Sequence, residues 1–303
     1  MAKKRADINF SDKYIKWFSE LGKNDIKIAG GKGANLGEMY NHRFPVPPGF
    51  VITADAFAFF ISDIKENIKN IMLDIDFENT EDLEKKSKET RKLIEEQEMP
   101  EELQIEILES YHILGSEKID EKGISQDALN ILRNSQEPIF VSVRSSATTE
   151  DLADASFAGQ QQSFLNVKGD ADLIEFIKKC FSSLYTARAM YYRNKKGFKE
   201  GKALLAVVVQ KMIDSEKSGV VFSKNPINVK DEIVVEAVFG LGEGIVSGMI
   251  NPDNYVVSGK NVKELKIKDI KVSDKKIAVV RSGSGENKVV KLSPEKSKEQ
   301  VLT

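Results

Sequence analysis

The chain has 303 residues, of which 41% are hydrophobic and 30% charged, and its formal net charge is −2. Such a composition is typical of a soluble globular protein of about two domains, and it excludes a strongly basic nucleic-acid binder. The longest apolar run, 203–209, is far shorter than the roughly 20 residues that span a bilayer. One cysteine, Cys180, and two histidines, His42 and His112, exclude a disulfide framework and a zinc site rich in cysteine or histidine. We therefore expect a cytoplasmic protein with no membrane or nucleic-acid partner.

The first half of the chain is predicted to be rich in helices. A glycine-rich segment at 30–37 leads into a helix, and a short strand at 50–52 leads into a second helix that Thr53 caps. Residues 74–137 include 19 acidic and 8 basic side chains, a local net charge of −11. Helical spacing there predicts a helix capped by Thr80 that runs to 97 and another that Pro100 opens. We interpret this acidic stretch as a solvated helical surface rather than a binding site.

The character of the chain changes near residue 201. Before this point we expect a buried strand at 139–143 and one long amphipathic helix at 171–193, in which Cys180 is a packing residue. After it, turn residues separate short predicted strands at 203–213, 219–223, 233–239 and 254–258. The sequence therefore predicts an α+β protein with a helix-rich first lobe, 1–200, which carries an acidic helical insert at about 60–137, and a β-rich second lobe, 201–303. A cleft between two such lobes is a usual place for a ligand.

The segment Gly30-Gly31-Lys32-Gly33 is the first candidate site. Glycines let backbone N–H groups approach an anion, and the helix that follows points the positive end of its dipole at the same place. Lys32 would add a mobile positive charge. The segment is not a Walker A loop, because Ile26 stands where that motif needs its first glycine. Phosphate binding and an ordinary glycine-rich turn before a helix are both open at this point.

Arg144 is the second candidate. It follows the apolar residues of the predicted strand 139–143 and precedes a cluster of hydroxyl side chains. A guanidinium at the end of a buried strand needs an anion beside it, and a phosphate gripped by two N–H groups would satisfy it. The alternative is an internal salt bridge to Glu150 or Asp151. The polar segment 154–163 that follows is suited to a mobile loop over a ligand, although a plain surface loop is the commoner case.

The third candidate, Gln210 with Lys211 and Met212, ends an apolar strand at a polar hinge. An extended backbone with an amide side chain can pair with the donor and acceptor on one edge of adenine. The simpler interpretation is a core strand whose glutamine and lysine face solvent.

The fourth candidate is the glycine-rich segment 240–248, which contains Glu243. With Asp253, this carboxylate could shape a phosphate or magnesium surface, or the segment could be a system of β-turns. A dinucleotide-binding fingerprint fails here, because Ile245 occupies the position of its last glycine.

Taken together and in this order, the motifs resemble the N-terminal nucleotide-binding region of phosphoenolpyruvate synthases (pyruvate, water dikinases). That region is shared by pyruvate phosphate dikinases and rifampicin phosphotransferases. The resemblance runs through nearly all of the chain, in segments 30–39, 46–50, 143–147, 155–160, 164–167, 210–212, 218–223 and 240–243. It implies an ATP-grasp fold of two lobes that binds ATP and Mg²⁺ in the cleft between them.

The resemblance also implies roles for individual residues. Lys32 and Arg144 would hold and neutralise the triphosphate and act in catalysis. The remaining contacts to the nucleotide would come from Gly159 and Ser163 in a loop over the phosphates, from Gln210 at the adenine with Lys211 and Met212 nearby, and from Glu243. Ser163 departs from the threonine that the family often has. The family's magnesium ligands follow the region seen here, so we expect no metal ligand in this chain.

A parent protein of this family would convert pyruvate, ATP and water to phosphoenolpyruvate, AMP and phosphate through a histidine on a swivelling domain. Neither His42 nor His112 lies in a glycine-rich context like that of the swivelling histidine. We therefore interpret the chain as an N-terminal fragment that binds ATP weakly and is inactive alone, with pyruvate bound by a missing C-terminal domain. The sequence leaves the oligomeric state open, and a homodimer is one of the assemblies open to the full-length form. The alternatives are the ATP-binding part of a rifampicin phosphotransferase and a non-catalytic ATP-binding module.

Overall fold

The computed structural model describes residues 13–116, 137–148, 162–197, 203–228, 230–259, 262–283 and 285–303. The chain divides into two compact units, Met1–Met212 (unit 1) and Ile213–Thr303 (unit 2), and each is described by itself. Both units mix helices with antiparallel sheet, so the predicted α+β class is confirmed. Among the described helices, none has the length and apolar character needed to cross a membrane.

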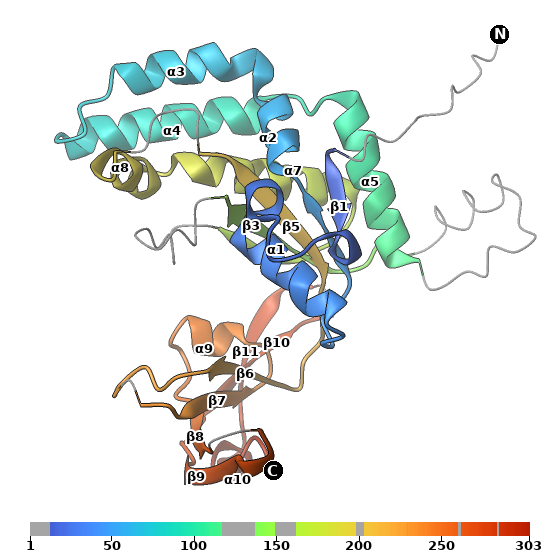
Figure 1. The fold of residues 1–303 in the computed structure, drawn as a ribbon, viewed down its shortest axis with the longest axis vertical. Helices are drawn as coiled ribbons and strands as arrows, with labels where there is room; N and C mark the ends of the chain where they lie inside the picture. The colour runs from blue at the N-terminus through green and yellow to red at the C-terminus, as the bar shows by residue number, and fades with distance from the viewer. Residues whose placement is uncertain are drawn as a thin grey trace, which may run out of the picture. The chain divides into compact units, whose positions relative to one another are not determined.

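Unit 1 contains a five-stranded antiparallel sheet with the order β1-β2-β5-β3-β4 (Figure 1). The strands are β1 (Ile15–Trp17), β2 (Gly49–Ile52), β3 (Val141–Ala147), β4 (Ser163–Val167) and β5 (Leu205–Lys211). β5 lies in the centre of this sheet, although the sequence analysis assigned 203–213 to the second lobe. Its residues before Lys211 are all buried, because it pairs with β2 on one side and with β3 on the other.

Helices cover both faces of this sheet. They are α1 (Ile26–Asn41), α2 (Ala54–Phe60), α3 (Lys65–Leu73), α4 (Thr80–Glu96), α5 (Glu101–Gly115), α7 (Asp170–Ser182) and α8 (Ala187–Lys195). Short 3₁₀ turns lie at Phe18–Glu20, Ser62–Ile64 and Ser183–Tyr185. Because strand side chains alternate between faces, the residues of β5 divide into two sets. Val207 and Val209 join the main core with Phe57 and Phe181, whereas Val208 packs in a smaller cluster under α1. Figure 1 shows α1 on one side of β3 and β5, and α7 on the other.

Three local expectations differ from the structure. The helix expected at 171–193 is two helices, α7 and α8, because the hydroxyl of Ser183 donates to the Cys180 carbonyl (2.6 Å) and Thr186 caps a new helix. The cap of α4 is Asn79 and not Thr80, since its side chain accepts from the backbone N–H groups of the first turn. The strand expected at 139–143 lies at 141–147, which places Arg144 in its middle rather than at its end.

The cap of α2 is as expected. Thr53 Oγ1 accepts a hydrogen bond from the backbone N–H of Ala56 at 3.2 Å. The same hydroxyl donates to the carbonyl of Lys13 at 2.7 Å, so this cap also fixes the chain that enters β1. The second helix of the acidic stretch, α5, begins directly after Pro100, in agreement with the sequence.

Unit 2 contains a four-stranded antiparallel sheet and a two-stranded hairpin. The sheet has the order β6-β7-β8-β9, with β6 (Lys217–Phe222), β7 (Ile233–Phe239), β8 (Asp253–Ser258) and β9 (Lys266–Lys271), and the hairpin consists of β10 (Ile277–Arg281) and β11 (Asn287–Lys291). Short helices lie at α9 (Glu243–Val246), α10 (Pro294–Ser297) and the 3₁₀ turn Val262–Glu264. Its core contains Ala237, Phe239, Tyr255, Ala278 and Val301, so strands of both sheets share one apolar interior.

Candidate functional site

The glycine-rich segment forms a kink inside α1. Gly30 has φ 68° and ψ 172°, which separates two helical segments that follow one another in the chain. A Cβ atom at this position would lie 2.2 Å from the carbonyl oxygen of Ser146 on β3. Gly31, Lys32 and Gly33 therefore form the first turn of the second segment, where a helix carries its partial positive charge. The expected helix N-terminus is present, although helical residues also precede it.

Ser146 joins this kink to β3. Its buried hydroxyl donates to the carbonyl of Ala29 at 2.8 Å and accepts the backbone N–H of Gly33 at 3.2 Å. These bonds bring together two motifs that are separated by 113 residues in the sequence. The first and second candidate segments are thus parts of one place in unit 1.

Arg144 lies on the same face of the sheet as Ser146, because the two residues are two positions apart on one strand. The register sets Arg144 opposite Ser163 of β4 on one side and Val208 of β5 on the other. Val208 packs under α1, Ser163 is exposed, and Arg144 itself is half-buried. This face of the sheet is therefore apolar under the helix and polar beside it.

Lys32 lies in the turn of α1 that is bonded to β3. Cys180 is fully buried on α7, and its thiol lies 3.7 Å from the carbonyl of Val143. Burial raises the pKa of this thiol, while a hydrogen bond from the Ser145 backbone and the positive charge of Lys32 oppose the rise. Lys32, which is half-buried, directly precedes Gly33, and the Gly33 N–H is bonded to Ser146, two residues after Arg144 on β3. Two cations and a helix N-terminus at one place can attract a polyanion.

Gln210 is buried on β5, in register with Ser142 of β3 and Gly49 of β2. Its side-chain N–H donates to the Pro47 carbonyl at 3.0 Å. The next two residues are also held by backbone bonds, from Lys211 N–H to the Pro48 carbonyl (3.0 Å) and from Met212 N–H to the Phe140 carbonyl (2.9 Å). The backbone at this end of β5 is therefore held in place by hydrogen bonds before any ligand binds. The contact between Gln210 and adenine stays a prediction.

The remaining candidate residues lie outside the described residues or in unit 2. Gly159, Glu150 and Asp151 lie outside the described residues. Glu243 is half-buried at the start of α9 in unit 2, and one of its carboxylate oxygens accepts from the side-chain N–H of Asn287. The interpretation of Asp253 as part of a phosphate or magnesium surface is wrong, because its side chain has no exposed area and pairs with Lys275.

The described part of the chain contains no cluster of side chains suited to bind a metal ion. No group of three or more His, Cys, Asp or Glu side chains there could hold a metal ion. Glu243 is bonded to Asn287 and Asp253 to Lys275, so neither carboxylate fits as a ligand in this arrangement.

Unit 1 also has an apolar pocket that is separate from these residues. Its volume is about 650 Å³, and its lining comes from α2, α3, α8 and their flanking turns, including Ile61, Ile68, Met72 and Leu184. None of the candidate residues lines it, so the pocket has no part in the site described here.

Sequence patterns missed Ser146, the residue that joins the two segments of the site. Ser146 was one of several hydroxyls in a cluster, and nothing local distinguishes the one that meets α1. Cys180 was correctly expected to pack, but its nearness to β3 and Lys32 follows from the position of α7.

Comparison with known proteins gives a consistent result. The family model described as "Pyruvate phosphate dikinase, AMP/ATP-binding domain" matches residues 26–303. A probable phosphoenolpyruvate synthase of Methanocaldococcus jannaschii is 46% identical over 296 residues, which cover 97% of this chain and 23% of that protein. A probable phosphoenolpyruvate synthase of Archaeoglobus fulgidus is also 46% identical, over 95% of this chain and 36% of the relative. The phosphoenolpyruvate synthase of Pyrococcus furiosus is 41% identical, over 96% of this chain and 38% of the relative. The chain thus spans well under half the length of these relatives.

Proposed function

Because the chain belongs to the pyruvate phosphate dikinase AMP/ATP-binding domain family, we propose that it is the ATP-binding part of a phosphoenolpyruvate synthase. The domain would adopt the ATP-grasp fold. The whole protein would convert pyruvate, ATP and water to phosphoenolpyruvate, AMP and phosphate. In the first half of this reaction the bond between the α and β phosphates of ATP breaks, the two terminal phosphates pass to a histidine elsewhere in the parent protein, and AMP leaves.

The junction between the kinked α1 and β3 is the observation that carries this proposal. Ser146 fixes the first turn of the second helical segment against β3, and this turn contains Lys32. Arg144 lies two residues before Ser146 on the same face of the sheet. Lys32 and Arg144 would bind the triphosphate, with the backbone amides of the helix start as further donors.

These residues can assist phosphoryl transfer without forming a covalent bond. Phosphoryl transfer spreads negative charge over the phosphate oxygens, so catalysis consists largely of positioning and charge stabilisation. Cations that are already in place stabilise that charge without reorganising at the moment of reaction. Removal of one such contact typically raises the barrier by about 3–4 kcal/mol.

The other predicted residues would supply the remaining contacts to ATP. Gln210 would contact the adenine beside the ordered backbone of Lys211 and Met212. Gly159 and Ser163 would cover the phosphates, and Glu243 would also contact the nucleotide. The register supports the place of Ser163, because this residue lies directly opposite Arg144. We assign no Mg²⁺ ligand to the described residues, and Mg²⁺ would arrive bound to the phosphates of ATP.

The experiment that tests this function is AMP formation by the full-length protein. Lys32→Ala and Arg144→Ala should each lower the rate at least about 100-fold, because each removes a cation from the developing charge. Lys27→Ala is the matched control, since Lys27 is an exposed lysine of α1 that precedes the kink, and its rate should be unchanged. Melting curves check that the variants fold. An unchanged rate for either Lys32→Ala or Arg144→Ala would refute the assigned roles.

A further inference from the structure

Unit 2 contains a buried ion pair that the nucleotide site does not use. The carboxylate of Asp253 contacts the ammonium group of Lys275, and neither side chain has any exposed area. Removing two charges from water costs several kcal/mol for each ion, so a buried pair is weak evidence for stability. The geometry that such a pair enforces is a better explanation for it.

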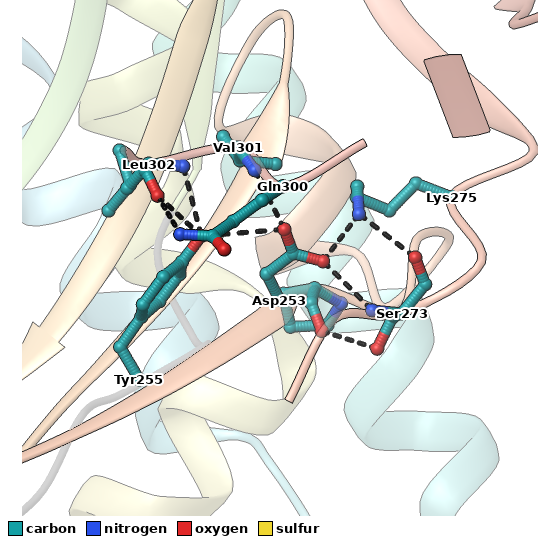
Figure 2. A network of polar contacts seen from close by, with 8 residues as sticks. Asp253, Tyr255, Ser273, Lys275, Gln300, Val301 and Leu302 are labelled. Carbon is teal, nitrogen blue, oxygen red and sulfur yellow. Dashed lines mark hydrogen bonds and ion pairs between the residues drawn. The ribbon is translucent and has the colours of Figure 1, made fainter. Parts of the chain in front are cut away.

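Each carboxylate oxygen of Asp253 is engaged, as Figure 2 shows. Oδ1 accepts from Lys275 and from the backbone N–H of Ser273 at 2.9 Å. Oδ2 accepts from the backbone N–H of Val301 at 2.8 Å. Lys275 donates a second bond to the Ser273 carbonyl at 2.9 Å. One carboxylate thus joins the first residue of β8, the connection from β9 to β10, and the segment 300–302.

Tyr255 extends the network along β8. Its hydroxyl oxygen accepts a hydrogen bond from the backbone N–H of Leu302 at 2.9 Å. The hydroxyl can donate either to the Leu302 carbonyl (3.3 Å) or to the Asp253 carboxylate (3.5 Å). The segment 300–302 is neither helix nor strand, yet Val301 is completely buried in the core of unit 2. Side chains therefore hold this segment where a strand would use backbone pairing.

The pair is connected through β7 and β10 to the glycine-rich turn that carries Glu243. Asp253 pairs with Ala237 on β7, the strand that runs into Gly240. Lys275 precedes β10, whose residue Val279 accepts the backbone N–H of Leu241 at 2.7 Å. A Cβ atom on Gly240 would lie only 2.2 Å from the Val279 carbonyl oxygen, so the turn depends closely on where β10 lies.

We propose that Asp253, Lys275 and Tyr255 are positioning residues for nucleotide binding. They fix β10 and the segment 300–302 against β8, and β10 in turn holds the Gly240–Glu243 turn, to which the proposed function gives a contact with ATP. None of the three touches the nucleotide. This inference rests on the proposed function, because it gives Glu243 and its turn a contact with ATP.

The test measures ATP affinity of the full-length protein by titration. Asp253→Asn should weaken ATP binding at least about tenfold, as expected when a group that orients a ligand-binding segment is lost. Tyr255→Phe removes one hydroxyl, should fold, and should weaken binding by about threefold, which keeps the test decisive if Asp253→Asn does not fold. Glu299→Gln is the control, because it removes the carboxylate of an exposed ion pair with Lys296, and its affinity should be unchanged.

A double-mutant comparison separates positioning from mere stability. Glu243→Gln alone should weaken ATP binding, and adding Asp253→Asn should cause no further loss, because both substitutions act through one turn. A loss of stability alone would leave the affinity of the folded protein unchanged. Additive losses, affinities of Asp253→Asn and Tyr255→Phe equal to the wild type, or no effect of Glu243→Gln would each overturn the inference. The proposed function is judged separately, on Lys32→Ala.

Discussion

At the scale of single residues, Gly30 decides how closely α1 approaches β3. Its φ of 68° with ψ of 172° belongs to a region that is essentially restricted to glycine and costs other residues about 1–3 kcal/mol, and it has no room for a side chain against Ser146. Gly197 has the same φ, 68°, but nothing lies within 4 Å of the position of its Cβ atom. A side chain at Gly30 would therefore meet Ser146 in addition to the cost of a positive φ, whereas a side chain at Gly197 would meet only the backbone cost.

We predict that Gly30→Ala lowers the free energy of unfolding by about 2–6 kcal/mol, since overpacking adds about 1–3 kcal/mol to a conformational cost of about 1–3 kcal/mol. Gly197→Ala should lower it by about 1–2 kcal/mol. Urea unfolding of both variants measures the difference. Equal losses would show that the contact between Gly30 and Ser146 is not as close as described.

Cys180 gives a prediction for pH. Burial raises the pKa of this thiol, so the folded chain keeps its proton above pH 8.5, where an unfolded cysteine ionises. The contribution to stability is fully present below about pH 8.5 and is lost as the pH rises, by up to about 1.4 kcal/mol per pH unit. Between pH 8.5 and 10, Cys180→Ala should remove this fall in unfolding free energy, although the variant is less stable at pH 7. Urea titrations at several pH values check it, and parallel slopes for both proteins would contradict it.

At the scale of elements, the interface between α1 and β3 depends on one hydroxyl. Ser146 satisfies two backbone groups of α1, whereas Ser183, also buried, donates to the Cys180 carbonyl within its own turn. The two serines are therefore comparable in burial but differ in what they join.

We predict that Ser146→Ala lowers the unfolding free energy by about 1–3 kcal/mol and also weakens ATP binding, because it leaves buried polar groups unsatisfied and releases the turn with Lys32. Ser183→Ala should lose stability of similar size with no change in ATP affinity. Calorimetric titration with ATP, run beside urea unfolding, distinguishes the two. The site would not depend on this junction if Ser146→Ala bound ATP like the wild type.

Sequence patterns predicted many of these elements because their signals are local. Thr53 caps α2 and α5 begins after Pro100, as expected from short-range hydrogen bonding and fixed backbone angles. The break between α7 and α8 was missed because the periodic apolar face continues on both sides of Thr186. Nothing in the local sequence marks Thr186 as the N-cap of a new helix. The pairing of β5 with β2 and β3 in unit 1 could not be predicted, because these strands are distant from it in sequence.

At the scale of the whole molecule, the sequence alone indicates that the glycine-rich motif and Arg144 share an anion site. In the structure, Ser146 joins the two segments that carry them. The family could be recognised because several motifs occur in one order, and the comparisons confirm it. Asp253 was misjudged because burial depends on its partner Lys275, twenty-two residues away. A carboxylate beside glycines has the same local pattern whether it binds a ligand or a buried lysine.

The most direct test of the central claim, that Lys32 and Arg144 form one triphosphate site at the kink of α1, is the ATP affinity of the full-length protein. Lys32→Ala and Arg144→Ala should each weaken ATP binding at least about tenfold at constant ionic strength, and Lys27→Ala should leave it unchanged. Wild-type affinity in either of the first two variants, or an equal loss in Lys27→Ala, would contradict the account.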